Sequence, residues 1–422
     1  MQAIHALSTG PLPSGVAVIR LSGEGVFDMV RNLTGTRRLP PPRTAMLRSI
    51  LHPKTQQLLD KALIITFPGP NSFTGEDVAE LHCHGSPAVV SALLRALTDL
   101  GSRPAEAGEF TRRAFLHGRM DLTQAEALSD LLAAETDAQR ELALANSGGR
   151  LRAEAEHWRS QLIDILADME ADFDFADESD VAETPERPAN RQLAQLVASL
   201  ETALNAAPLA ERIRHGLTIA IVGPPNAGKS SLMNALARRD VAIVTPHAGT
   251  TRDVLEIHVD LAGRPATLLD TAGLRETADP IEAEGIARAR ARASSADLLL
   301  DLGEGGNIRN KIDETGLPPG RHDGRFHLSA RTGAGLAELE SWLTQWAATQ
   351  IPTGEPPLVS TERQRQLIAE TLLYAREAQT QKDPVLAAES LRSAAHALGR
   401  LTGRIDPEAV LGAIFSRFCI GK

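Results

Sequence analysis

Cysteine is nearly absent from this chain of 422 residues, which contains only Cys83 and Cys419. Two cysteines cannot build a disulfide framework, and their scarcity is typical of proteins of the reducing cytosol. Aromatic residues make up only 3% of the chain, so aliphatic and alanine-rich helix packing must supply most of the core. We therefore expect a cytoplasmic protein of ordinary globular composition.

Long apolar runs and an excess of positive charge are missing as well. No apolar run reaches the roughly 18 residues that a membrane span requires, and the N-terminus lacks the basic and apolar regions of a signal peptide. We therefore expect no membrane partner. The formal net charge is −10, which argues against a protein that coats nucleic acid but still allows a local basic patch.

The first part of the chain, residues 1–117, mixes short apolar runs with turn signals. The segments GVAVIRLSG and ALIITFPGP have the composition of strands bounded by glycine and proline. A helix is expected to begin at Ser86 and Pro87 and to end at Gly101. These patterns predict an α+β domain.

The remaining chain predicts one domain inserted into another. Helical periodicity runs from about 118 to about 170, with a T-x-x-E capping pattern at Thr123–Glu126. The acidic segment 171–190, which contains two prolines, is expected to be a loop, and the helical pattern resumes after it and continues to 213. Strand and helix signals then alternate over 214–345, and helices return over 346–422, one of them capped by Asp383. We predict a multi-domain α/β and α fold, in which an α/β domain interrupts a helical domain.

A phosphate-binding motif stands at the start of the inserted domain. GPPNAGKSS at 223–231 matches G-x-x-x-x-G-K-[ST], directly after an apolar strand and before a helix. Gly223 and Gly228 let the backbone N–H groups turn toward phosphate oxygens, Lys229 supplies a cation, and Ser230 offers a hydroxyl to Mg²⁺. The chain has only six lysines, so a chance match is improbable.

Four further motifs follow in the order that a GTPase requires. GTTRD at 249–253 offers Thr251 to Mg²⁺, and DTAG at 270–273 offers Asp270 to the magnesium shell and the Gly273 N–H to the γ-phosphate. In NKID, Asp313 can accept hydrogen bonds from guanine N1–H and N2–H₂, which adenine does not offer. SAR at 329–331 can cover guanine O6 with an N–H. Each motif is weak alone, but together they favour GTP over ATP.

The residues predicted to bind GTP come from all of these motifs. They are Asn226, Ala227, Gly228, Lys229, Ser230, Ser231, Thr245, Pro246, His247, Ala248, Gly249, Thr250, Thr251, Asp270, Thr271, Ala272, Gly273, Asn310, Lys311, Asp313, Ser329, Ala330 and Arg331.

The position that orients the attacking water differs from that of a Ras-type site. There a glutamine follows the D-x-x-G motif, whereas this chain has Leu274, which cannot form a hydrogen bond. Another group must position the water. Glu276, Glu282 and Glu284 lie just downstream, although the residues alone do not distinguish any of them from a solvated helix face.

The sequence resembles the MnmE (TrmE) family of tRNA-modification GTPases along essentially its whole length. The segments that carry the resemblance are GVAVIRLSG, FPGPNSFTGEDVAELHCHG, GEFTRRAFLHGRMDLTQAEAL, GPPNAGKSSLMNALA, AIVTPHAGTTRD, DTAGLRE, RNKID, LSARTG and FCIGK. Several are long and do not occur in GTPases generally, so the match is specific to this family.

The resemblance implies an N-terminal folate-binding domain that forms a homodimer, a discontinuous helical domain and an inserted Ras-like P-loop G domain. On this basis the domains are 1–117, 118–213, 214–345 and 346–422. The family, together with the flavoprotein MnmG, which carries FAD, modifies the wobble uridine of certain tRNAs at carbon 5. A tetrahydrofolate derivative supplies the carbon, and an aminomethyl or carboxymethylaminomethyl group results.

The resemblance also implies hydrolysis activated by K⁺ when G domains dimerise. The matching K⁺ ligands are Asn226, Thr245, His247 and Thr250, and Mg²⁺ is held by Ser230 and Thr251. A monovalent cation there would spread positive charge over the bridge between the β- and γ-phosphates. The catalytic glutamate of the family falls on Glu282, which raises it above its two neighbours.

The folate-binding positions of the family fall on Arg20, Glu80, Arg119 and Lys422. The family more often has lysine at position 119. The tail FCIGK has Cys419 four residues from its end, as in a prenylation signal, but glycine and lysine there are atypical. A frayed terminus is the general expectation, whereas the resemblance implies a tail that folds back toward the folate pocket.

The segment LHCHG admits a metal alternative. His82 and His84 would share one face of a strand, but zinc normally takes three or four protein ligands and no partner cluster is evident. A structural or folate-pocket role is therefore the favoured interpretation.

The sequence departs from the family between LLLDL and NKID. Only residues 303–309 separate them, which is too short for the helix that normally connects two parallel strands. A strand and a helix near 303–309 are therefore expected to be missing, with Ile308 as the only strand candidate. This leaves an alternative function open: a GTP-switched folate-binding scaffold with degenerate GTPase activity and no tRNA chemistry.

Overall fold

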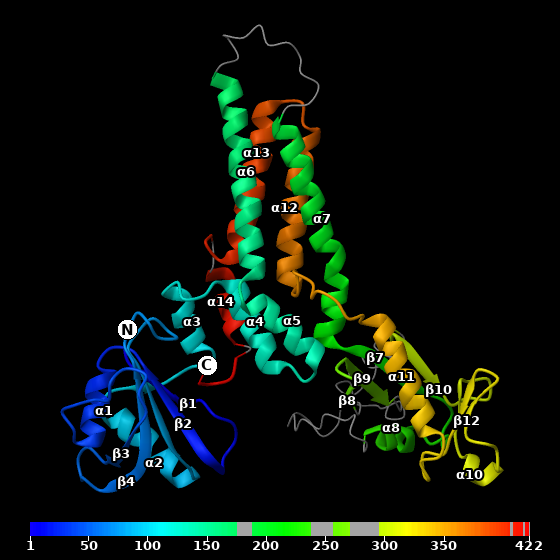
Figure 1. Ribbon diagram of the computed structural model, residues 1–422, viewed down its shortest axis with the longest axis horizontal. Helices are drawn as coiled ribbons and strands as arrows, with labels where there is room; N and C mark the ends of the chain where they lie inside the picture. The colour runs from blue at the N-terminus through cyan, green and yellow to red at the C-terminus, as the bar shows by residue number, and fades with distance from the viewer. Residues whose placement is uncertain (175–187, 238–255, 271–294, 406–407, 417, 422) are drawn as a thin grey trace, which may run out of the picture. The chain divides into compact units, whose positions relative to one another are not determined.

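The computed structural model describes residues 1–174, 188–237, 256–270, 295–405, 408–416 and 418–421 (Figure 1). The chain divides into two compact units, Met1–Ser129 with Ala395–Lys422, and Asp130–Ala394. The domain boundaries expected from the sequence stay predictions. None of the helices in the described ranges is long and apolar enough to cross a membrane.

A six-stranded sheet forms the framework of the first unit, with strands in the order β3-β4-β5-β2-β1-β6. Its central strands alternate buried and partly exposed residues, so one face of the sheet is covered and the other, called the open face below, is partly exposed over β2 to β5. On β1 this second face is buried as well, because Ile4 and Ala6 pack with Phe110. The strands are β1 (Ile4–Leu7), β2 (Ser14–Ser22), β3 (Met46–Leu51), β4 (Leu58–Phe67), β5 (Val78–Gly85) and β6 (Arg103–Pro104).

Helices α1 (Val26–Thr34) and α2 (Pro87–Asp99) cover one face of this sheet. Buried aliphatic residues of the two helices, such as Val30 and Leu93, pack with Ile19 and Leu81 of the strands in one core. The predicted strands and the helix that begins after Ser86 are confirmed. Three more helices contribute to this unit, α3 (Glu109–Leu116), the start of α4 (Leu122–Ala133) and α14 (Glu408–Phe415).

The predicted cap of α4 is wrong by two residues. The helix begins at Leu122, so Thr123 already lies inside it. The cap is Asp121, whose carboxylate accepts a hydrogen bond from the Gln124 N–H at 2.9 Å, while the Gln124 side chain accepts one from the Asp121 N–H at 3.2 Å. Aspartate competes well for this position, and the reciprocal pair that it forms with Gln124 fixes the start of the helix.

Long helices dominate one part of the second unit, where α6, α7 and α12 lie side by side (Figure 1). The predicted cap at Asp383 is confirmed, because its carboxylate accepts a hydrogen bond from the Val385 N–H at 2.9 Å. Within the segment expected to be a loop, 171–190, residues 175–187 lie outside the described residues, whereas 171–174 and 188–190 are helical, so the prediction was wrong at both ends of the segment. The helices are α5 (Asp137–Ser147), α6 (Arg150–Asp174), α7 (Pro188–His215), α12 (Glu362–Thr380) and the first part of α13 (Pro384–Thr402), whose residues from Ala395 onward belong to the first unit.

The predicted α/β insertion forms the other part of the second unit. Its main sheet has the order β10-β7-β9-β8, in which β7, β9 and β10 are parallel. A separate small sheet has the order β11-β13-β12. The elements are β7 (Leu217–Val222), α8 (Lys229–Ala237), β8 (Glu256–Asp260), β9 (Pro265–Asp270), β10 (Leu298–Asp301), β11 (Ile308–Arg309), α10 (Ile312–Thr315), β12 (Gly320–His322), β13 (Arg325–His327) and α11 (Leu336–Gln350).

This arrangement shows how the shortened segment connects β10 to NKID without a crossover helix. A strand does precede NKID, but it has only the two residues of β11, and it pairs with β13 rather than with β10. No helix lies between β10 and β11 in this fully described stretch. Residues of both sheets, including Leu300, Ile308 and Phe326, nevertheless share one hydrophobic core with α8 and α11.

Candidate functional site

The phosphate-binding motif lies where β7 ends and α8 begins. Gly228 has φ +92°, and a Cβ added to it would lie 2.3 Å from the Asn310 amide nitrogen, so both backbone conformation and space require glycine. Lys229 is buried, and its ammonium donates to the carbonyls of Gly223 and Pro224 at 2.9 and 3.0 Å. The loop and the helix N-terminus thus form a turn suited to phosphate.

The residues expected at the magnesium side are brought together. Ser230, in the first turn of α8, donates its hydroxyl to the carboxylate of Asp270 at 2.6 Å. Asp270 is the last residue of β9 and is 3% exposed. A hydroxyl and a carboxylate at this spacing are hard oxygen ligands, which is the donor type that Mg²⁺ takes beside nucleotide phosphates. These two side chains therefore fit a magnesium ion.

The base-recognition residues converge on Asp313. The Ser329 hydroxyl donates to one carboxylate oxygen at 2.5 Å, and the exposed Arg331 guanidinium forms an ion pair with the other. The Ser329 hydrogen bond, a backbone hydrogen bond and the charge of Arg331 together hold the pKa of Asp313 below its ordinary value. Asp313 is consequently ionised at neutral pH and is a ready acceptor for two guanine N–H groups.

Asn310 joins the phosphate side to the base side. Its amide nitrogen donates to the Ala227 carbonyl at 3.0 Å, and its carbonyl oxygen accepts from the Ala330 N–H at 3.0 Å and from the Lys311 N–H at 2.8 Å. One side chain therefore ties together the P-loop, NKID and SAR. These are the three segments that the sequence predicts to surround a guanine nucleotide.

A large part of the predicted nucleotide site lies outside the described residues. This holds for the predicted catalytic residue Glu282, and for Lys422 of the folate site. The other such residues are Thr245, Pro246, His247, Ala248, Gly249, Thr250, Thr251, Thr271, Ala272 and Gly273. Of the K⁺ ligands, Asn226 alone is described, and it has φ +63° in the exposed turn of the P-loop.

A second candidate site lies on the open face of the N-terminal sheet. Arg20 on β2 and Glu80 on β5 are directly paired in register and form an ion pair at 2.9 Å. His82, next on the same face, lies 3.2 Å from Glu80. The Arg20 guanidinium lies 5.8 and 5.9 Å from the ring centroids of Phe73 and Phe110. A carboxylate, a guanidinium and aromatic rings could hold a pterin and an anionic tail.

The described residues of the tail, 418–421, are packed against the N-terminal unit, with Phe418 and Gly421 buried. Gly421 is buried, and a Cβ on it would lie 2.3 Å from the Leu7 carbonyl oxygen of β1. The Gly421 carbonyl accepts from the Ser8 hydroxyl at 3.0 Å, and Ile420 forms a β-bridge with Ala107. The tail thus contacts the end of β1, the strand that pairs with β2 and places Ala6 opposite Arg20. Arg119 is exposed, with its side-chain stem beside Gly75.

The two histidines of LHCHG do share the open face of β5. His82 interacts with Glu80, and His84 with Asp60 at 2.7 Å. Across the described ranges, no group of three histidine, cysteine or acidic side chains is arranged to hold a metal ion. The geometry therefore favours acid–base pairing along the strand for both histidines.

Sequence reasoning missed the ion-pair network around Arg113. This guanidinium is 4% exposed and contacts Glu76 at 2.9 Å, Glu109 at 2.9 Å and the Gln2 carbonyl at 2.9 Å. The network attaches α3 to the loop that precedes β5 and to the start of the chain. The spacing of Glu109 and Arg113, four residues apart on one helix, is the signal that could have revealed it.

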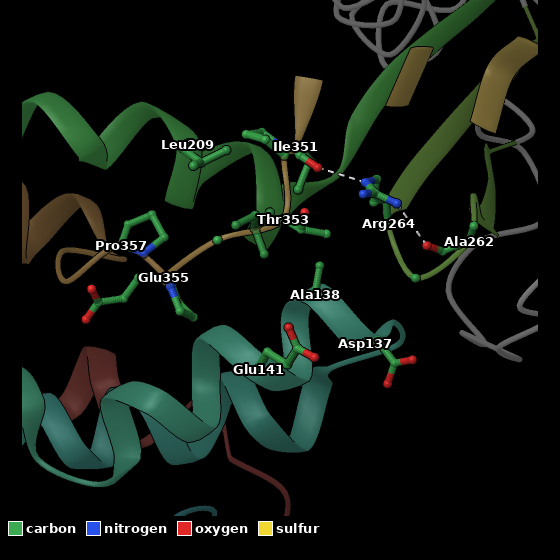
Figure 2. Close-up of a pocket in the computed structure, with 15 residues that line it drawn as sticks. Asp137, Ala138, Glu141, Leu209, Ala262, Arg264, Ile351, Thr353, Glu355 and Pro357 are labelled. Carbon is green, nitrogen blue, oxygen red and sulfur yellow. Dashed lines mark hydrogen bonds between the residues drawn. The ribbon is translucent and has the colours of Figure 1, made fainter. Parts of the chain in front are cut away.

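A cavity of about 260 Å³ lies where α5 and α7 meet the β8–β9 turn (Figure 2). Arg264 lines it and donates to the Ile351 carbonyl at 2.7 Å, and the Ala138 N–H donates to the Gly263 carbonyl at 2.9 Å. The cavity borders the start of β9, whereas Asp270 is at its end. The nucleotide site and this cavity therefore lie at opposite ends of β9.

Comparison with known proteins identifies relatives over the whole chain. The family model for the GTP-binding protein TrmE N-terminus matches residues 3–119, and that for the MnmE helical domain matches residues 122–419. A tRNA modification GTPase MnmE of Rhodopseudomonas palustris is 49% identical over 439 positions, which cover 100% of this chain and 99% of that protein. The one from Azorhizobium caulinodans is 50% identical, covering 99% and 98%.

The aligned length of 439 positions exceeds the 422 residues of this chain, so the Rhodopseudomonas protein has residues that this chain lacks. Among solved structures, the G domain of the T. maritima FeoB iron transporter covers 31% of this chain and 98% of that chain at 26% identity. Its TM-score of 0.23 is too low to support an argument.

The fold and the P-loop arrangement define a multi-domain protein with an inserted G domain of the P-loop GTPase class. Its two family-model matches and its relatives of 45–50% identity narrow the assignment further. The chain belongs to the MnmE family of tRNA modification GTPases.

Proposed function

We propose that this chain binds and hydrolyses GTP at the site formed by the P-loop, Asp270, NKID and SAR. The observation that carries the proposal is the position of Asn310, whose amide joins the P-loop carbonyl of Ala227 to the SAR N–H of Ala330. The shortened segment before NKID has therefore not separated the base side from the phosphate side.

Each described residue has a definite part in this proposal. The backbone turn at Gly228 binds phosphate, and Lys229 exchanges its two loop carbonyls for the β- and γ-phosphate oxygens. Ser230 and Asp270 would hold Mg²⁺, which neutralises charge on the phosphates when bound. Asp313, ionised at neutral pH, accepts from guanine N1–H and N2–H₂ after Arg331 releases it.

The activation of hydrolysis is part of the same proposal. Leu274 cannot orient water, so Glu282 is assigned to this role, with K⁺ bound by Asn226, Thr245, His247 and Thr250. Asn226 is compatible with the cation assignment, because it lies in the P-loop and its side chain is exposed. The support for Glu282 is the resemblance to the family alone.

The N-terminal unit is proposed to bind a tetrahydrofolate derivative with Arg20, Glu80, Arg119 and Lys422, and to form a homodimer. The open face that carries Arg20 and Glu80 also exposes two leucines that are paired across β3 and β4, Leu47 and Leu63. Exposed apolar residues beside charged ones are typical of a protein interface.

The relatives are named tRNA modification GTPases. We propose that this chain, with a flavoprotein partner of the MnmG type that carries FAD, acts on the wobble uridine of tRNA in the cytoplasm. The folate would donate the carbon of an aminomethyl or carboxymethylaminomethyl group at C5. The alternative is a GTP-switched folate-binding scaffold without tRNA chemistry, which the short crossover near 303–309 keeps open.

GTP turnover by the purified chain, in potassium and in sodium buffer with ATP as the control, tests the G-domain proposal. We expect GTP-selective turnover that requires potassium, and Glu282→Ala should abolish turnover while nucleotide still binds. Equal turnover of GTP and ATP would contradict the proposed base recognition. Turnover by Glu282→Ala at the parent rate would remove Glu282 from its role.

Gene deletion tests the tRNA proposal separately. We expect the C5 modification of wobble uridine, measured by mass spectrometry of digested tRNA, to disappear and to return when the parent chain is supplied. Unchanged modification in the deletion strain would favour the scaffold. A double variant, Arg20→Ala with Glu80→Ala, serves as the folate arm, because it removes the paired guanidinium and carboxylate of the candidate folate site while leaving the G domain unchanged.

A further inference from the structure

The strand β10 ends at Asp301 and β11 begins at Ile308, so six residues connect them. A crossover between neighbouring parallel strands needs a dozen residues or more. The two strands are accordingly not paired: β10 is the edge of the main sheet, and β11 is the edge of the small sheet. Something other than backbone pairing must hold the small sheet, and with it NKID, in register with the main sheet.

The side chain of Asn307 makes this connection. Its amide nitrogen donates to the Leu299 carbonyl at 2.8 Å, and its amide oxygen accepts from the Asp301 N–H at 2.8 Å. These two groups flank Leu300. A residue of a neighbouring parallel strand would likewise donate to the carbonyl before Leu300 and accept from the N–H after it. A single primary amide thus reproduces one residue of the missing strand.

The main chain of Asn307 belongs to the small sheet. Its carbonyl accepts from the Phe326 N–H at 2.8 Å, and two residues later the Arg309 carbonyl accepts from the Leu328 N–H at 2.9 Å. Ile308, between them, is in register with Phe326. Asn307 therefore bonds to the main sheet through its side chain and to the small sheet through its backbone.

The turn before Asn307 brings it to the edge of β10. The Gly306 N–H donates to the Gly303 carbonyl at 3.0 Å, and the Asp301 carboxylate accepts from the Gly303 N–H at 2.8 Å. A Cβ on Gly306 would lie 2.0 Å from the Asp301 carbonyl oxygen, so only glycine allows this return of the chain. The turn is compact enough to fix where Asn307 meets the sheet.

We propose that Asn307 is a positioning residue for guanine recognition. Its side-chain amide takes the place of a peptide group of a neighbouring strand at the edge of β10 and so holds NKID in position. The proposal rests on the proposed binding of guanine nucleotides. Asn310 follows only three residues later and joins Ala227 to Ala330, and Asp313 follows on the next turn. An error in register at Asn307 therefore moves the groups that read the base before it moves the P-loop.

The test compares Asn307→Leu with Glu304→Leu. Leucine matches asparagine in shape but has neither donor nor acceptor, and Glu304 is an exposed residue of the same turn whose side chain has no role in the connection. The affinities for GDP and for inosine diphosphate are measured by titration. Inosine lacks the N2 amine that Asp313 accepts from, so the ratio of the two affinities reports the position of Asp313 separately from general destabilisation.

For Asn307→Leu we expect GDP affinity to fall roughly tenfold, as for the loss of one or two hydrogen bonds, and the preference for GDP over inosine diphosphate to shrink. Glu304→Leu should keep both parent values. An Asn307→Leu protein with parent GDP affinity, or with both affinities lowered by the same factor, would overturn the proposal.

Asn307→Asp provides the second arm if the leucine variant does not fold. Aspartate keeps the acceptor for the Asp301 N–H but loses the donor to the Leu299 carbonyl. This variant should therefore also lower the affinity for GDP more than the affinity for inosine diphosphate. Parent GDP affinity, or equal lowering of both affinities, would overturn the proposal. Failure of the underlying function is recognised separately, because in that case the parent chain itself binds neither nucleotide.

Discussion

The carboxylate of Glu109 is held by three donors. Arg103 donates from two guanidinium nitrogens at 2.5 and 2.8 Å, Arg113 donates at 2.9 Å, and the Glu106 N–H donates at 3.0 Å. Burial raises the pKa of Glu109, but these hydrogen bonds outweigh burial and lower the pKa to about 2, from an ordinary value of 4.5. The ionised form is therefore much better accommodated in the folded unit than the neutral form.

This shift predicts how the stability of the N-terminal unit depends on pH. Because the pKa of Glu109 is lower in the folded state, its contribution is fully present above the unfolded value of 4.5 and is lost as pH falls toward the folded value of about 2. The full shift corresponds to about 3 kcal/mol of unfolding free energy, of which about 2 kcal/mol is lost between pH 7 and pH 3.

Urea unfolding at pH 7 and pH 3 measures this contribution without screening the ion pairs. The first unit has no tryptophan or tyrosine, so its unfolding is followed by the reaction of Cys83, which is 3% exposed, with dithiodipyridine in a Cys419→Ser background. We expect Glu109→Gln, which cannot titrate, to lose about 2 kcal/mol less than the parent between the two pH values.

The variant is also expected to be less stable at pH 7, because Arg113 is buried and keeps only Glu76 as a charged partner. Glu106→Gln, at an exposed neighbouring position, is the matched control and should lose as much stability as the parent. Equal losses in the parent and in Glu109→Gln between pH 7 and pH 3 would refute the assignment of the low pKa to Glu109.

Three further results are expected. Asp313→Asn should lower GTP affinity about 100-fold and favour xanthosine triphosphate, whose C2 carbonyl can accept from the new amide; a variant that still prefers GTP would contradict the assigned contact. Iodoacetamide at pH 8 should modify the exposed Cys419 alone, because burial raises the pKa of Cys83 to about 11; mass spectrometry showing equal labelling would disprove this. Arg264→Ala should cost about 1 to 2 kcal/mol in the tryptophan-monitored transition by removing the donor to Ile351, and an unchanged midpoint would disagree.

The features that sequence reasoning could predict are those that a local pattern specifies. The apolar strand followed by G-x-x-x-x-G-K-[ST] predicted β7, the phosphate loop and α8, because a buried parallel strand and a glycine turn leave few alternatives. Asp383 predicted the start of α13 for the same reason. The prediction of the α4 cap failed because Asp121–Gln124 and Thr123–Glu126 both have the sequence pattern of a helix start, and the sequence alone does not decide between them.

The features that were missed depend on contacts between segments that are far apart in the sequence. Arg113 reaches Glu76 and the Gln2 carbonyl, 37 and 111 residues away, and no periodicity in the chain encodes those distances. The role of Asn307 depends on a turn whose closure requires Gly306 to lie against the Asp301 carbonyl. The sequence showed that the crossover was too short, but not how six residues would compensate for it.

The shortened crossover indicates which constraint the G domain must satisfy. Continuity of one sheet is not that constraint, since β10 and β11 are unpaired. The connection through Asn310 is, because its side chain joins Ala227 of the P-loop to Ala330 of SAR. In the role proposed for Asn307, the phosphate loop and the base-recognition loop stay together without backbone pairing because the side chain of Asn307 holds the residues before Asn310 at the edge of β10.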